Sequence, residues 1–206
     1  MAVRERVTRW VISQFRNPRG LGGHVTGWIM GHRPSNVQRN RWVVSLLDLS
    51  PTDRILEVGF GPGVALRELA RLAPHGYVCG IDRSEVMVRQ ARRRNAAAVR
   101  AGVLDIRAGT AEDVPQFDRP FDRVMAVNSL GFWQDPEKRL EELRKVLRPG
   151  GLIAIASQPR CPGATAATSD AAAGEIVALL DAVGFDDLRV ERLDLQPPVI
   201  CVLGRC

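Results

Sequence analysis

Residues 55–63 read Ile55-Leu56-Glu57-Val58-Gly59-Phe60-Gly61-Pro62-Gly63, a short apolar run followed by alternating glycines. The run is typical of a buried strand, and the glycines permit a tight turn into a following helix. Backbone N–H groups at the start of such a helix favour an anionic ligand. The alternative is a plain tight turn that binds no ligand. The stretch therefore predicts a strand–turn–helix unit with a candidate binding site at the turn.

Strand-like and helix-like segments alternate on the C-terminal side of this unit. Strands are expected at 54–59, 77–82, 104–109, 121–128 and 151–157, and helices at 36–49, 63–72, 84–98, 136–147 and 170–183. Two further strands, 188–195 and 199–204, are joined only by Gln196-Pro197-Pro198. That link is too short for a parallel crossover, so these strands must pair antiparallel. The pattern predicts an α/β fold with an open, doubly wound, mostly parallel sheet.

Composition indicates a soluble globular protein. The 206 residues are 45% hydrophobic and 25% charged, unlike a disordered chain. No apolar run reaches the roughly 18–20 residues that span a bilayer, and residues 1–15 lack a secretory signal, so a cytoplasmic location is expected. The cysteines show neither metal-site spacing nor a disulfide framework, and no metal is expected; they are Cys79, Cys161, Cys201 and Cys206.

The excess positive charge is confined to the N-terminal quarter. The net charge is +6, and residues 1–50 contain eight arginines against Glu5 and Asp48. Arginine is strongly preferred over lysine, which is typical of a biased genomic composition. A basic face of this kind supports only weak, salt-sensitive attraction to phosphates. Nucleic acid is therefore not the expected partner.

Residues 1–35 are expected to form a helical arm that precedes the main domain, 36–206. Apolar residues recur at helical spacing near the start, with arginines around the rest of the helix. Trp10, Trp28 and Trp42 could form a lid over a substrate or pack across the helices of the sheet. The arginine-bearing helix could instead make peripheral contact with an anionic membrane surface.

The glycine spacing separates several kinds of nucleotide site. Val64 stands where the dinucleotide fingerprint requires a small residue, and no phosphate-binding P-loop motif is present. Glu57 would repel phosphate but attract an ammonium group, directly or through water. Asp82 ends the second strand, where a carboxylate can accept both hydroxyls of a ribose or cap the next helix. These features favour a nucleoside that carries an amino acid.

At this point the chain resembles the class I S-adenosylmethionine-dependent methyltransferases, over about residues 36–206. The resemblance rests on the order and spacing of five segments: 55–63, 78–82, 109–115, 121–128 and 147–151. It implies a seven-stranded sheet with an antiparallel C-terminal strand. It also implies S-adenosylmethionine as cofactor, S-adenosylhomocysteine as product, and no metal.

The resemblance further implies a set of cofactor-binding residues. Glu57 and the three loop glycines would hold the methionine and ribose portions, and Asp82 the ribose hydroxyls. The segments after the second and third strands would meet the adenine, although Glu112 could instead be solvated, and the carbonyl of Asn128 would meet the methionine ammonium. The complete set is Glu57, Gly59, Gly61, Gly63, Asp82, Arg83, Met87, Thr110, Ala111, Glu112 and Asn128.

The expected reaction is an in-line displacement, in which proximity and alignment supply much of the rate acceleration. The acceptor should lie beyond the carboxyl ends of the strands, near 128–133, 157–160 and the arm. His24 and His32 are candidate bases, and both could equally be linker or capping residues. A small-molecule acceptor is expected. A membrane lipid or quinone, RNA, and a non-catalytic cofactor-binding module remain as alternatives.

Overall fold

The structure, a computed structural model, describes residues 31–206. The predicted lid or membrane role of the arm, including Trp10, Trp28 and His24, concerns residues outside this range. The strands are β1 (Arg54–Val58), β2 (Tyr77–Asp82), β3 (Leu104–Ala108), β4 (Phe121–Val127), β5 (Leu147–Ser157), β6 (Asp186–Leu193) and β7 (Val199–Arg205). The described helices are α3 (Pro34–Ser45), α4 (Val64–Leu72), α5 (Glu85–Arg94), α6 (Ala96–Arg100), the short η1 (Leu130–Phe132), α7 (Pro136–Val146) and α8 (Ala166–Ala182).

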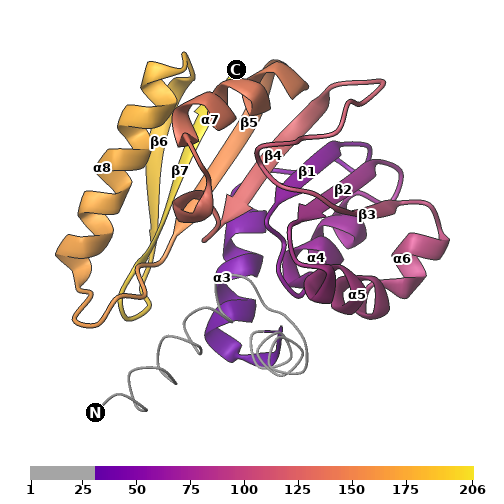
Figure 1. The fold of residues 1–206 in the computed structure, drawn as a ribbon, viewed down its shortest axis with the longest axis horizontal. Coiled ribbons are helices and arrows are strands. Elements are labelled where there is room, and N and C mark those ends of the chain that lie inside the picture. The colour runs from indigo at the N-terminus through magenta and orange to yellow at the C-terminus, as the bar shows by residue number, and fades with distance from the viewer. Residues whose placement is uncertain (1–30) are drawn as a thin grey trace.

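The strands form one sheet in the order β3-β2-β1-β4-β5-β7-β6 (Figure 1). Pairing is parallel from β3 through to β5, whereas β7 runs antiparallel to both β5 and β6. The predicted mostly parallel sheet with an antiparallel C-terminal strand is therefore confirmed. The chain turns outward from β1 in both directions, first to β2 and later to β4, which opens a crevice at the carboxyl end of β1.

Helices cover both faces of the sheet and bury it in two hydrophobic clusters. One cluster joins α3, α4 and α5 to one face, and the other joins α7 and α8 to the opposite face (Figure 1). The adjacent β1 residues Ile55 and Leu56 are fully buried, and they belong to different clusters because successive strand residues point to opposite faces. The apolar β1 sequence is thus explained by burial on both sides.

Three predicted helices differ clearly in their bounds. The helix expected at 170–183 begins four residues earlier, at Ala166, and ends at Ala182. The helix expected at 36–49 runs from Pro34 to Ser45, because proline suits the first helical turn and Asp48 adopts a positive φ of 48°. The helix expected at 84–98 is split into α5 and α6 at Asn95. Within residues 31–206, no helix is both long and apolar enough to cross a bilayer.

Candidate functional site

The glycine loop lies at the carboxyl end of β1, between the ends of β2 and β4. Gly59, Gly61 and Gly63 all have positive φ, at 81°, 54° and 72°. This region disfavours residues that carry a Cβ, so glycine permits the chain to pass from β1 into α4 in so few residues. The N–H of Gly59 donates to the carbonyl of Ile81 at 2.8 Å, which ties the loop to β2.

The three glycines meet different surroundings. A Cβ at Gly59 would lie 2.5 Å from the Cβ of Ser129, and one at Gly63 would lie 2.7 Å from the Cβ of Ala91. Close packing therefore requires glycine at both positions. A Cβ at Gly61 would meet nothing within 4 Å. The backbone at Gly61 faces open space, so a ligand can approach it there.

Two polar residues that the sequence analysis did not single out support this loop. Ser129 Oγ donates to the carbonyl of Val58 at 2.7 Å. Asn95 Nδ2 donates to the carbonyls of Gly63 at 3.1 Å and Ala91 at 2.9 Å. Asn95 therefore stands at the break between α5 and α6 and also anchors the loop. Only tertiary contacts reveal these roles, because neither residue belongs to a recognisable local motif.

Asp82 closes the loop from the side of β2. Its Oδ2 accepts the N–H of Gly61 at 2.8 Å, and its Oδ1 accepts the N–H of Ser84 at 2.9 Å. Burial raises the pKa of Asp82 to about 6, although these hydrogen bonds and the charge of Arg83 act to lower it. Ser84, and not Asp82, caps α5, so the alternative prediction that Asp82 caps this helix is wrong. Each carboxylate oxygen has a further lone pair that can accept a ligand hydroxyl.

Glu57 lies on β1, two residues before the first glycine of the loop, and is only 1% exposed. Burial, followed by the nearby charge of Asp82, raises the pKa of Glu57 to about 8. Among the described residues its Oε2 has no hydrogen-bond partner. A buried carboxyl oxygen without a donor is costly, so the site is suited to a ligand that brings a cation or an N–H group.

The segment after β3 joins the same edge of the sheet. The N–H of Gly109 donates to the carbonyl of Asp82 at 3.1 Å, and Ala111 is buried while Thr110 is partly exposed. Glu112 is exposed and its Oε1 accepts the N–H of Gln134 at 2.9 Å. Burial acts to raise the pKa of Glu112, but hydrogen bonds, first that from Gln134, leave it lowered. Its carboxylate therefore holds the turn before α7.

The other predicted positions are more scattered. Arg83 is exposed directly after Asp82, whereas Met87 is 2% exposed and belongs to the hydrophobic core on the α5 side. Asn128 has a φ of 54°, and its Oδ1 accepts the N–H of Gln158 at 2.7 Å. Asn128 thus links the carboxyl ends of β4 and β5. Among the candidate bases, His32 is exposed and His24 lies outside the described residues.

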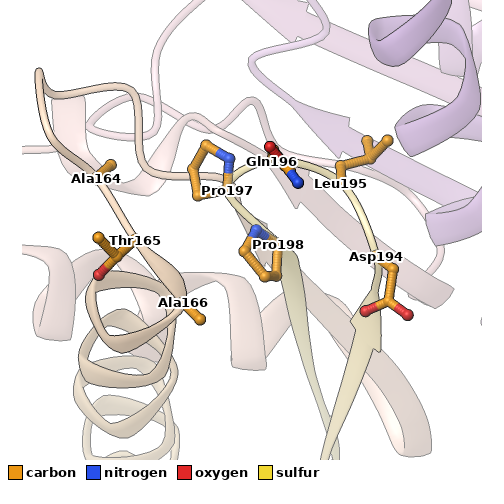
Figure 2. A pocket seen from close by; sticks show the side chains of 8 residues that line it. All are labelled: Ala164, Thr165, Ala166, Asp194, Leu195, Gln196, Pro197 and Pro198. Carbon is orange, nitrogen blue, oxygen red and sulfur yellow. The ribbon is translucent and has the colours of Figure 1, made fainter.

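A separate hollow of about 640 Å³ lies between the start of α8 and the β6–β7 link (Figure 2). It is lined by Ala164–Ala166 and Asp194–Pro198, which are remote from the glycine loop in the sheet order. Gln158 Nε2 donates to the carbonyl of Pro197 at 2.8 Å, so this hollow borders the end of β5. Within residues 31–206, no group of three or more His, Cys, Asp or Glu residues is arranged to hold a metal ion.

Alanine substitutions at Gly61 and Gly63 should separate backbone strain from close packing. Both place a Cβ at positive φ, which costs roughly 1–2 kcal/mol. Only Gly63→Ala also crowds Ala91, which adds about 1–3 kcal/mol of overpacking. We expect denaturant unfolding to show a lower free energy of unfolding for Gly63→Ala than for Gly61→Ala. Equal values for the two variants would contradict the packing assigned to Gly63.

The buried carboxyl of Glu57 should make the unliganded protein less stable as the pH rises. Its folded pKa of about 8 exceeds the ordinary value of 4.5, so the folded state holds a proton that the unfolded chain releases between these values. Stability from this group is full below pH 4.5 and is lost as the pH rises through 8. We expect Glu57→Gln to flatten the decline in the free energy of unfolding between pH 5 and 8. The exposed Glu141→Gln should follow the wild type, and parallel curves for all three proteins would refute the assignment.

Comparison with known proteins shows which family this chain belongs to. Residues 55–151 match the model of a family described as a methyltransferase domain. An uncharacterised methyltransferase of Bacillus subtilis, YdaC, is 30% identical over 182 residues, which cover 88% of this chain and 97% of YdaC. The ubiquinone/menaquinone biosynthesis C-methyltransferase UbiE of Geotalea daltonii is 34% identical over 116 residues, which cover 56% of this chain and 49% of UbiE.

The solved structures agree on the fold. A S-adenosylmethionine-dependent methyltransferase from Aquifex aeolicus has a TM-score of 0.65 at 21% identity, covering 84% of this chain and 97% of its own. The sheet order and the glycine loop therefore agree with the sequence comparison, in which YdaC is matched along nearly its whole length. The chain belongs to the class I S-adenosylmethionine-dependent methyltransferases.

Proposed function

We propose that this enzyme transfers the methyl group of S-adenosylmethionine to a small-molecule acceptor, with the cofactor held by Glu57, Asp82 and the glycine loop. The observation that carries the assignment of the site is the buried Oε2 of Glu57, which has no donor among the described residues. The methionine ammonium of the cofactor supplies that donor and a compensating positive charge.

The rest of the loop fits the same cofactor. Asp82 presents carboxylate oxygens at the end of β2, where the ribose hydroxyls can donate to them. The open space at Gly61 lets the cofactor approach the backbone more closely than any side chain would allow. Asp82 and Gly61 are direct neighbours, because the Asp82 carboxylate accepts the N–H of Gly61.

S-Adenosylmethionine, when bound, supplies a methyl group activated by a positively charged sulfur. The protein's part is to hold the donor and the acceptor in line and to keep water from the reacting groups. A hydrogen bond between Asn128 and Gln158 joins the ends of β4 and β5 next to the glycine loop, where the acceptor is expected to lie. His24 and His32 remain candidate bases for an acceptor that must lose a proton.

A small molecule is the acceptor class that the sequence and fold favour. The segment Asn128-Ser129-Leu130-Gly131 lacks the N-P-P-[YF] signature of base-methylating enzymes of this fold. All of the net positive charge lies in residues 1–50, and the remaining residues carry no net charge. A basic segment of this kind supports only weak, salt-sensitive attraction to the phosphates of RNA. The match to UbiE spans about half of each protein, so its quinone acceptor stays an alternative for this chain.

Thermal unfolding with S-adenosylmethionine, S-adenosylhomocysteine, NADH or no ligand tests the cofactor. A ligand at about 100 times its Kd adds roughly 2.7 kcal/mol to the free energy of unfolding. We expect both sulfur nucleosides, and not NADH, to raise the melting temperature. Transfer of labelled methyl from S-adenosylmethionine to a panel of small acceptors then separates an enzyme from a binding module. Binding without transfer to any acceptor would favour the module.

The substitution Asp82→Asn should weaken S-adenosylhomocysteine binding. It removes a charged acceptor for the ribose hydroxyls, a loss of about 1.5–3 kcal/mol or roughly 10- to 150-fold in Kd. Asn retains one oxygen for the backbone donors, so the fold should persist, as circular dichroism can verify. The exposed Asp181→Asn on α8 is the matched control and should bind as the wild type does. Unaltered affinity in Asp82→Asn would remove Asp82 from the cofactor site.

A further inference from the structure

A cluster of arginines lies at the carboxyl end of β5, on the side away from the nucleoside part of the site. Arg39 on α3 is only 4% exposed, and its Nη1 donates to Gln158 Oε1 at 2.7 Å. Arg160 Nη2 donates to the same oxygen at 3.2 Å. Burial lowers the pKa of both Arg39 and Arg160, and the nearby charge of Arg33 lowers both further. We call Arg33, Arg39 and Arg160 the arginine cluster.

The positive charge of this cluster is not balanced. Within residues 31–206, neither Arg39 nor Arg160 has a carboxylate within ion-pair distance. Their guanidinium groups bond neutral amide oxygens instead: both bond that of Gln158, and Arg39 also bonds that of Asn36. Residues 1–30 contain one acidic residue, Glu5, against five arginines. The Nε of Arg39 is buried and has no hydrogen-bond partner in the part of the chain that the structure describes. A buried cation such as Arg39 is costly without an anion, so an anion bound beside it would stabilise the cluster.

The cluster lies on the acceptor side of the site. The backbone N–H of Gln158 donates to Asn128 Oδ1, so the cluster is joined directly to the end of β4. Figure 1 shows α3, which carries Arg39, near the end of the sheet toward which β4 points. Asp82 ends β2, and β1 and β4 separate β2 from β5. Three strand spacings of about 4.8 Å place the cluster roughly 14 Å from the proposed ribose site.

We propose that the arginine cluster binds an oxyanion, a carboxylate or a phosphate, carried by the methyl acceptor; this rests on the proposed methyltransferase function. Guanidinium groups present paired N–H donors that match two oxygens of such an anion. The exposed Arg160 can offer these donors without disturbing the core, while the buried Arg39 beside it adds positive charge and holds Gln158 in place. The acceptor class is therefore an acidic small molecule and not a neutral quinone.

Binding of small anions provides the test. Benzoate and inorganic phosphate are titrated by calorimetry into the full-length protein, with and without S-adenosylhomocysteine, at an ionic strength kept constant with chloride. We expect saturable binding of at least one anion to the wild type and about a tenfold or greater loss in Arg160→Gln. Arg39→Lys, which keeps the charge but loses the paired donors, should also weaken binding. The preferred probe identifies the anion as carboxylate or phosphate.

The control is Arg119→Gln, an exposed arginine before β4 whose loss changes the net charge equally; it should bind anions as the wild type does. Absence of saturable binding, or binding that Arg160→Gln leaves intact, overturns the proposal. So does a loss of S-adenosylhomocysteine affinity in Arg160→Gln without a loss for 5′-methylthioadenosine, since the cluster would then bind the cofactor's own carboxylate. Failure of the wild type to bind S-adenosylhomocysteine refutes the proposed function instead. The titration of anions without S-adenosylhomocysteine still tests the arginine cluster in that case.

Discussion

The passage from β1 into α4 through three left-handed glycines is the constraint on which the site depends. Because Gly59 and Gly63 allow Ser129 and Ala91 to pack directly against the loop, the ends of β4 and α5 come close to β1. Asp82 then joins the loop to β2 through the N–H of Gly61. The loop thus gathers groups from three strands at one point and leaves one backbone segment open to a ligand.

Two buried ionisable groups with incomplete hydrogen bonding, one acidic and one basic, lie at the same end of the sheet. Glu57 lies beneath the glycine loop, and Arg39 lies beside the end of β5. Folding alone does not favour either group, because both burial and the nearest charges oppose ionisation. Such local departures from a well-satisfied interior are expected where a protein binds a ligand. Their opposite signs suit a ligand pair with an ammonium at one end and an oxyanion at the other.

The pattern of the sequence predicted most of the fold. The strand at 77–82 was predicted with its observed bounds, and the antiparallel C-terminal strand followed from a three-residue link. Helix ends were less accurate. The interruption at Asn95 was missed because its side chain bonds the carbonyl of Gly63, a residue distant in sequence, as well as that of Ala91. Ser129 and Gln158 fall in the ranges expected near the acceptor, but their contacts were not predicted, since each bonds a residue distant in sequence.

The sequence by itself determined the α/β class and the glycine turn, because apolar runs and glycine spacing act through local backbone geometry. The carboxylates at the strand ends favoured a nucleoside that carries an amino acid. Tertiary structure alone decided which groups lack partners. The unpartnered oxygen of Glu57 and the unbalanced charge of Arg39 arise only when the chain packs around these side chains and removes them from water. Desolvation depends on everything that surrounds a group, and no local stretch of sequence contains that information.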